Sequence, residues 1–208
     1  MFSNCRKWLN IISLVFFSWA LVGCESFGPD AETLTLDAPV DYSYIIGPGD
    51  TLSIFVWRNP ELSQSVPVRP DGKISVPLVE DLKASGRTAT QLARDIEVVL
   101  SQFVKEPLVT VIVQGFSGVY AEQIRVVGEA TQPRALPYRT NMTILDVMIE
   151  VGGLTEFADG NEARLVRQTG SGRLQARMRL EDLLRDGDIT ANVPVAPGDI
   201  VIIPEAWF

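Results

Sequence analysis

An apolar run near the N-terminus constrains this 208-residue chain more than any other feature. Residues 11–22 contain no charged side chain and are interrupted only by two serines, and Arg6 and Lys7 precede them. A helix needs about 20 apolar residues to cross a bilayer, so this run is short for a membrane anchor. A positive flank followed by a short apolar core is typical of a secretory signal. We therefore expect residues 1–23 to be a signal peptide.

The four residues that end this run, Leu21-Val-Gly-Cys24, resemble the cleavage box of bacterial lipoproteins. A bulky aliphatic residue, a small residue and Gly precede the Cys, so we expect cleavage before Cys24 and acylation of its thiol, which would hold the protein on a membrane. Glu25 follows, which favours the outer membrane by resemblance to lipoprotein sorting in enteric bacteria. Two alternatives stay open: an ordinary signal peptide cut at a small residue, and an uncleaved anchor starting near Trp8.

Composition excludes several classes of protein. Histidine is absent, and Cys24 would be the one cysteine left after cleavage, so Ser-His or Cys-His nucleophile pairs and imidazole metal sites are excluded. Cleavage also leaves 16 basic side chains against 26 acidic ones, a net charge of about −10, which disfavours nucleic-acid binding. We therefore expect no enzymatic activity, no metal, no cofactor and no nucleic-acid partner. Without a disulfide, each domain must close its own core.

Turn residues and hydrophobic periodicity divide the rest of the chain into a tether and two domains. Residues 24–41 carry Gly and Pro without any period, which predicts a flexible tether. The first domain is predicted at 42–115, and its elements are a strand at 51–57, a hairpin at 65–76 turning at Pro70-Asp-Gly72, a helix at 89–103 opened by the capping box Thr88-Ala-Thr-Gln91, and a strand at 108–113.

The second domain is predicted at 122–205 and combines strands with one principal helix. Its elements are strands at 123–128, 134–138, 163–168, 173–178 and 199–203, a helix opened at Thr143 and ended by Gly152-Gly153, and a short helical stretch at 180–185. Both domains are thus expected to have an α+β fold with a helix on a mixed sheet. Pro48-Gly-Asp50 and Pro197-Gly-Asp199 both precede an apolar strand, which we interpret as a shared turn and not as a repeat.

Several segments resemble the Wza-like outer-membrane polysaccharide export proteins. Four segments are similar to the N-terminal export domain of the family: Tyr44 to Trp57, Pro60-Glu-Leu-Ser63, Val68 to Ser75 and the helix start at Gly86-Arg-Thr88. Residues 123–168, with Val126-Val-Gly-Glu129 and Glu150-Val-Gly-Gly-Leu-Thr155, resemble its soluble-ligand-binding β-grasp (SLBB) domain, in one copy. Trp57-Arg-Asn-Pro60 and the closing segment from Ile202 resemble a subfamily found beside exosortase (PEP-CTERM) sorting systems, which serves exopolysaccharide export.

The resemblance implies a non-enzymatic export component that is lipid-anchored at the periplasmic face of the outer membrane and assembles as a homo-oligomeric collar around an exopolysaccharide chain. Large family members end in a pore-forming helix, whereas five residues follow the last predicted strand here. We therefore expect a separate outer-membrane β-barrel protein as one partner, and the family implies an inner-membrane polysaccharide co-polymerase or chain-length regulator as another. The alternative is a monomeric periplasmic adaptor that binds glycan or peptidoglycan, which a groove of adjacent exposed aromatics would favour.

Four residues are candidate glycan contacts. Trp57 and Tyr44, with Phe55 and Tyr42 nearby, could stack on the apolar face of a pyranose, although their spacing also suits packing in a core or domain interface. Arg167 and Arg177 belong to an Arg-rich segment that could contact an anionic polymer or form a solvated face.

Three acidic residues, Asp50, Asp71 and Asp199, could act as paired acids in glycoside hydrolysis. All three belong to Pro/Gly turns, which favours the interpretation that the carboxylates stabilise the turns. At the other end of the chain, Trp207 and Phe208 could contact lipid headgroups or the barrel partner, or dock onto their own domain.

Overall fold

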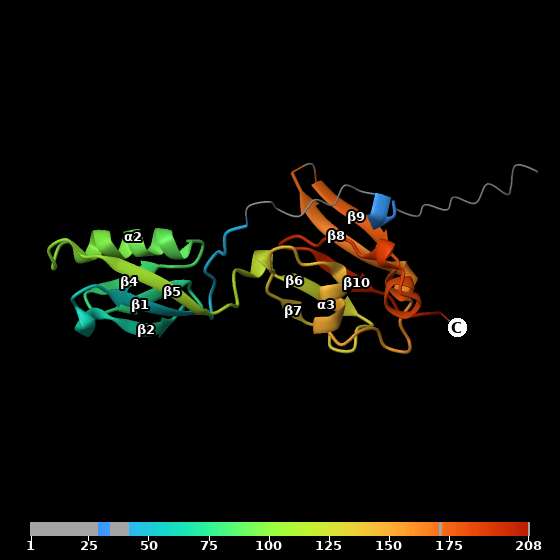
Figure 1. The fold of residues 1–208 in the computed structure, drawn as a ribbon, viewed down its shortest axis with the longest axis horizontal. Coiled ribbons are helices and arrows are strands. Elements are labelled where there is room, and N and C mark those ends of the chain that lie inside the picture. Colours follow the sequence, from blue (N-terminus) through green and yellow to red (C-terminus); the bar gives the residue numbers. More distant parts are fainter. Residues whose placement is uncertain (1–28, 34–41, 171, 208) are drawn as a thin grey trace, which may run out of the picture.

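The computed structural model describes residues 29–33, 42–170 and 172–207, which form two domains joined by short connections (Figure 1). Both domains combine strands with helices, so the expected α+β fold is confirmed. The predicted signal peptide and Cys24 lie outside the described residues. Among the described residues, no helix has the length and hydropathy to span a membrane.

The first domain is built on a three-stranded antiparallel sheet. Strand β1 (Thr51–Val56) lies between β2 (Gln64–Pro67) and β5 (Val109–Gly115). The hairpin of β3 (Lys73–Val76) and β4 (Val79–Lys83) and the helix α2 (Ala89–Leu100) contribute to one core with the inward residues of this sheet. One face of β1 is thereby buried, while the opposite face carries residues that remain open to solvent.

The hairpin expected at residues 65–76 is wrong in its pairing. The turn at Pro70-Asp-Gly72 forms, with the Gly72 N–H donating to the Arg69 carbonyl at 2.8 Å. However, β2 pairs with β1, and β3 pairs with β4, a strand that was not predicted from the sequence. The physical reason is a shortage of backbone N–H donors that could pair β2 with β3. Pro67 and Pro70 have no N–H, and the Val68 N–H donates to the Asp50 carbonyl at 2.8 Å.

Helix α2 begins where the sequence predicts and ends earlier. The Gln91 N–H donates to Thr88 Oγ1 at 3.2 Å, and the Thr88 N–H donates to Gln91 Oε1 at 3.0 Å, which confirms the capping box. The last residue is Leu100, three residues before the expected end. Ser101 starts the exit, since its hydroxyl donates to the Val98 carbonyl at 2.7 Å, and Phe103 is exposed and not on the buried face.

The second domain has a five-stranded sheet in the order β7-β6-β10-β8-β9, in which β10 runs parallel to β6 and antiparallel to β8. The strands are β6 (Ile124–Gly128), β7 (Ala135–Leu136), β8 (Ala163–Thr169), β9 (Gly172–Met178) and β10 (Ile200–Ile203). Helix α3 (Ile144–Glu150) packs on one face and contributes Ile144, Val147 and Met148 to the core. Short helical turns complete both domains: η3 (Pro60–Leu62), η4 (Tyr120–Glu122), η5 (Gly160–Glu162), the π-helical η6 (Asp182–Asp186) and η7 (Ile189–Ala191).

Residues 29–33, here called the N-terminal strap, differ from the flexible tether expected at 24–41. The strap (blue in Figure 1) lies against β9 of the second domain, which is far from it in sequence. The Arg177 N–H donates to the Pro29 carbonyl at 3.1 Å. In η2 (Ala31–Thr33), the Ala31 side chain is 1% exposed and belongs to the second domain's core. The strap is ordered because it covers the edge of the outermost strand and buries an apolar side chain.

Candidate functional site

The two Pro-Gly-Asp sequences form the same turn in both domains. Gly49 and Gly198 have φ of 90° and 84°, and the Asp50 and Asp199 N–H groups donate to the carbonyls three residues earlier at 3.3 and 3.2 Å. Pro at the second position and a Gly with positive φ at the third define a type II turn. Each Asp side chain also accepts the N–H of the first turn residue, at 2.9 and 2.7 Å. The expected shared turn is therefore confirmed at atomic level.

Asp50 connects its turn to the linker between the domains. Its carboxylate is fully buried and accepts hydrogen bonds from the Tyr44 hydroxyl at 2.7 Å and from the Ser117 and Gly118 N–H groups at 2.7 and 2.9 Å. Burial first, and then the bond to Asp50, raise the pKa of Tyr44 above its usual value. All of these donors come from the protein itself, so Asp50 and Tyr44 hold the linker in place.

Asp199 plays the corresponding role in the second domain with a charged partner. Its carboxylate is fully buried and binds the Arg167 guanidinium at 2.9 and 2.7 Å. Arg167 also donates to the Pro194 carbonyl at 3.1 Å, and its side chain is 11% exposed. The guanidinium is thus enclosed by its own domain, which leaves little of it open to a polymer.

Asp71 lies at the surface and stabilises its turn. Its carboxylate pairs with the Arg69 guanidinium at 2.5 Å and accepts the Lys73 N–H at 3.2 Å. The hydrogen bond from Arg69 is the main reason that the pKa of Asp71 falls to about 2. For all three acids the contacts favour turn stabilisation. Within the described residues, no cluster of acidic or cysteine side chains is arranged to hold a metal ion.

The remaining predicted contacts divide between the domain junction and the surface. Tyr42 donates its hydroxyl to Glu122 at 3.0 Å and meets Tyr138 edge-on at 4.9 Å, so it packs at the junction. Arg177 donates from Nε to the Asn161 carbonyl at 2.8 Å and lies 3.3 Å from a Glu162 oxygen. Trp57 is exposed at the end of β1.

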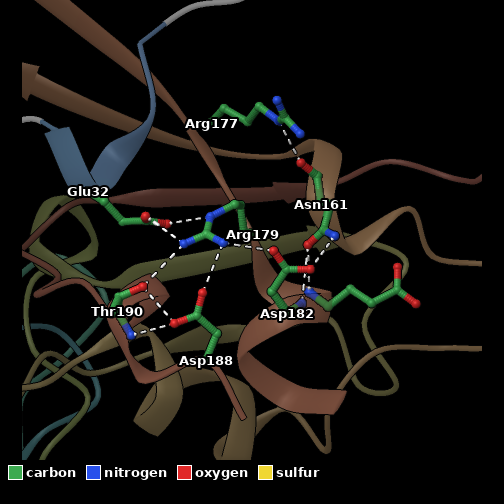
Figure 2. Close-up of polar contacts among 8 residues, drawn as sticks. Glu32, Asn161, Arg177, Arg179, Asp182, Asp188 and Thr190 are labelled. Atoms are coloured by element: carbon green, nitrogen blue, oxygen red, sulfur yellow. Dashed lines mark hydrogen bonds and ion pairs between the residues drawn. The ribbon is translucent and has the colours of Figure 1, made fainter. Parts of the chain in front are cut away.

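An ion cluster fixes the N-terminal strap, and no local sequence signal predicted it. Figure 2 shows the Arg179 guanidinium surrounded by Glu32 of the strap and by Asp182 and Asp188 of its own domain. Arg179 binds both Glu32 oxygens, at 2.9 and 2.7 Å, and each Asp at 2.9 Å. Because Glu32 and Arg179 are 147 residues apart, only the tertiary structure brings them together.

The outer face of the β2-β1-β5 sheet carries an apolar stripe. The β1–β5 register sets Phe55 opposite Thr110 and Ser53 opposite Ile112, and the Trp57 N–H donates to the Leu108 carbonyl at 2.9 Å. Period-two alternation then directs these side chains away from the core. We call this set the apolar stripe, and each of its side chains is about half exposed. It consists of Phe55, Trp57, Leu108 and Ile112. The alternation of residues 108–112 was the available signal. The β-branched residues of this segment favour a central strand, but that prediction is wrong, because β5 lies at the edge of the sheet.

The structure thus consists of two small α+β domains, each with a buried turn acid, and the first domain carries an exposed apolar stripe. Residues 38–114 match the family model described as polysaccharide biosynthesis/export protein, and residues 123–178 match the SLBB domain model. The two matches together cover more than half of the chain. The chain therefore belongs to the polysaccharide export protein family, which confirms the resemblance seen in the sequence.

The names of similar proteins refer to polysaccharide export, production or transport. The chain is 28% identical over 187 residues to the EPS I polysaccharide export outer membrane protein EpsA of Ralstonia nicotianae, covering 78% of this chain and 47% of that protein. It is 28% identical over 177 residues to the exopolysaccharide production protein ExoF of Rhizobium meliloti, covering 78% and 40%. It is 26% identical over 167 residues to the polysialic acid transport protein KpsD of Escherichia coli, covering 77% and 28%. The chain thus spans less than half the length of these relatives.

Proposed function

We propose that this protein is a non-enzymatic component of exopolysaccharide export that forms a homo-oligomeric periplasmic collar, anchored by lipid on Cys24 at the periplasmic face of the outer membrane. Family membership and the names of EpsA and KpsD, which refer to polysaccharide export and transport, support the export role. The polymer passes through or along the collar, a separate outer-membrane β-barrel protein completes the route, and an inner-membrane co-polymerase or chain-length regulator delivers the chain.

The apolar stripe is the observation that carries the collar. Contiguous exposed apolar side chains on a soluble domain mark a surface that a partner covers. The partner is a second copy of this chain, because the stripe lies on the domain that matches the export family and its four side chains are large, apolar and each about half exposed. A head-to-tail contact, in which the stripe of one copy binds a different surface of the next, forms a ring when the rotation between copies closes, which is the geometry that a collar requires.

The adaptor alternative rests on the aromatic pair within the same stripe. Phe55 and Trp57 lie 6.4 Å apart edge-on, and with Arg58 and Pro60 they line a groove of about 210 Å³. Adjacent aromatics in a groove would suit a glycan. The Arg58 side chain is the one strongly polar group among these lining residues, whereas sugar recognition needs several donors and acceptors. The groove is therefore better suited to a protein side chain.

The N-terminal strap sets where a lipid anchor would act. Four residues lie between Cys24 and Pro29, so the five Cα–Cα steps reach at most about 18 Å in extended chain. Because the strap is fixed to the second domain, acylated Cys24 would hold that domain close to the membrane.

The decisive experiment measures the native mass of the full-length protein extracted in mild detergent. We expect a discrete high-order oligomer in the wild type that co-purifies with an outer-membrane barrel, and loss of membrane association in Cys24→Ala. The double variant Phe55→Ser/Trp57→Ser should yield monomers. The matched control is Val98→Ser, which removes an exposed apolar side chain from α2, outside the stripe.

Three outcomes contradict the proposal in different ways. A monomeric wild type argues against the collar, and an oligomer that survives the stripe variant argues against the stripe as its interface. Dissociation of Val98→Ser as well would show that general surface hydrophobicity holds the copies together. A wild type that stays monomeric and binds glycan through Trp57 would identify the adaptor.

A further inference from the structure

A second cleft lies on the outer face of the second domain's sheet, next to the end of the chain. Its volume is about 430 Å³, and its lining includes Arg164 of β8, Gln175 of β9 and Ile202 of β10. Glu162, Glu205 and Trp207 are further lining residues. The cleft is therefore built on three adjacent strands.

Hydrogen bonds hold the backbone that carries Trp207. The Asp159 N–H donates to the Pro204 carbonyl at 2.9 Å, and the Ala206 N–H donates to the Phe157 carbonyl at 2.8 Å. An isolated bridge between Ala158 and Glu205 lies between these two bonds. The chain after β10 is thus fixed as far as Ala206, which positions the next residue at the cleft.

The indole of Trp207 is fully exposed. It does not dock onto its own domain, and Phe208 lies outside the described residues. Tryptophan presents a large apolar ring face together with an N–H donor, so a fully exposed indole gains free energy when a ligand covers it. Ile202 adds a partly exposed apolar surface within the same cleft.

The polar groups of the cleft have unused hydrogen-bonding capacity. Within the described residues, the Arg164 guanidinium and the Gln175 amide make no side-chain hydrogen bond or ion pair. Arginine supplies donors, glutamine supplies both a donor and an acceptor, and the carboxylates of Glu162 and Glu205 supply acceptors. A ligand with many hydroxyl groups matches this set, because each hydroxyl both donates and accepts.

We propose that this cleft binds neutral pyranose residues of the exported polysaccharide, with the sugar ring stacked on Trp207 and its hydroxyls bonded to Arg164 and Gln175. The proposal rests on the proposed export function and adds a site and a ligand class to it. Neutral sugars fit best because the lining carries three carboxylates, those of Asp159, Glu162 and Glu205, against the Arg164 guanidinium and the nearby Arg177, which pairs with Glu162 at 3.3 Å, so the balance of charge stays negative. These carboxylates would repel uronic acids.

The contrast between the two exposed tryptophans supports this assignment. Trp57 lies in a groove whose other lining is mostly apolar, whereas Trp207 lies among four charged side chains and an amide. The shallow, solvent-open position of the indole suits transient contacts, which a moving polymer requires.

The test titrates the full-length protein in mild detergent by calorimetry with a fixed set of oligosaccharides. The neutral set is cellohexaose, maltohexaose, laminarihexaose and mannohexaose, and the anionic probe is hexagalacturonic acid. We expect at least one neutral hexamer to bind with a Kd between about 10 µM and 1 mM. Hexagalacturonic acid should bind at least ten-fold more weakly.

Variants locate the contact. Trp207→Ala and Gln175→Ala should each weaken binding of the neutral hexamer at least ten-fold, and Trp207→Phe should retain part of the affinity. Val98→Ser, which changes an exposed side chain of α2 in the first domain, should leave the affinity unchanged. Because Trp207 is fully exposed, its variants should unfold at the wild-type temperature, which separates lost contact from lost fold.

Absence of binding by every neutral probe, tighter binding of hexagalacturonic acid, or undiminished binding by Trp207→Ala would overturn the proposal. The native-mass experiment is independent of these results. Sugar binding through Trp207 in a monomeric protein would disprove the collar and retain this site, whereas a collar that binds none of the probes would disprove this site alone.

Discussion

Glu32 and Arg179 form a two-point ion pair across 147 residues of sequence, with Nε–Oε1 and Nη2–Oε2 distances of 2.9 and 2.7 Å. Two parallel hydrogen bonds between a guanidinium and a carboxylate fix orientation as well as distance. The same guanidinium is held by Asp182 and Asp188, so it is already positioned when the strap arrives. The first segment of the described chain is therefore an integral part of the last domain.

Replacing Ala31 by Glu should release the strap without unfolding the second domain. The 1%-exposed methyl would be replaced by a carboxylate that has no partner in the core, and undocking five residues costs less than burying that charge. Hydrogen exchange of the Arg177 amide, which donates to the Pro29 carbonyl, should accelerate at least ten-fold. Glu32→Gln, which keeps the apolar contact, should show a smaller effect. Amides of the β8–β9 ladder serve as the internal control, and unchanged exchange at Arg177 would contradict the role of the strap.

Removing the charge of Asp199 should destabilise the protein more than removing that of Asp50. Asp199→Asn leaves the Arg167 guanidinium enclosed without its counter-ion, which costs about 3–5 kcal/mol. The Asp50 carboxylate faces only neutral donors, so Asp50→Asn should lower the free energy of unfolding by about 1–3 kcal/mol. Urea unfolding of both variants measures the difference. The double variant Asp199→Asn/Arg167→Leu should recover part of the loss, and equal losses in the two single variants would argue against the ion pair as the cause.

Gly47→Ala should destabilise the junction between the domains by about 1–3 kcal/mol. An added Cβ would lie 1.9 Å from the Gly118 carbonyl oxygen and 2.5 Å from the Val119 nitrogen, both backbone atoms. The control is Gly170→Ala, where nothing lies within 4 Å of the new Cβ. In thermal unfolding, the melting temperature should decrease clearly for Gly47→Ala and hardly at all for Gly170→Ala. Similar melting temperatures for both variants would show that the linker can move away.

The contribution of Asp71 to the free energy of unfolding should depend on pH. Its pKa of about 2 in the folded protein lies below the value of about 3.9 expected in the unfolded chain, so the stabilisation is present above about pH 4 and is lost as the pH falls toward 2. The difference in unfolding free energy between wild type and Asp71→Asn should therefore shrink across this interval. The effect is small because the pair is exposed. A difference that stays constant from pH 5 to pH 2 would contradict the Arg69 pairing.

Local signals predicted the parts of this fold that depend on local physics. The capping box at Thr88, the Pro-Gly-Asp turns and the strand alternation each act within a few residues, so they are readable in sequence. The pairing of β3 was not predicted because the partner of a strand depends on which donors remain free, and proline together with the Asp50 carbonyl decided this across the fold.

Among the predicted site residues, the exposed Trp57 was identifiable as a surface aromatic only once the sheet register was known. Tyr44 and Arg167 are of polar types that suit a glycan, yet their partners Asp50 and Asp199 take up much of their hydrogen-bonding capacity. Trp207 carried no periodic signal at all. Its exposure follows from the bonds that fix the backbone on either side of Glu205.

The sequence by itself determined the α+β class, the two domains, the turns and family membership, because composition, periodicity and short motifs act locally along the chain. The tertiary structure alone decided that the N-terminal strap completes the second domain, that one sheet face carries an apolar stripe, and that Trp207 meets free polar groups at a cleft. These features depend on contacts between residues far apart in sequence, whose free energy is realised only after the chain has folded.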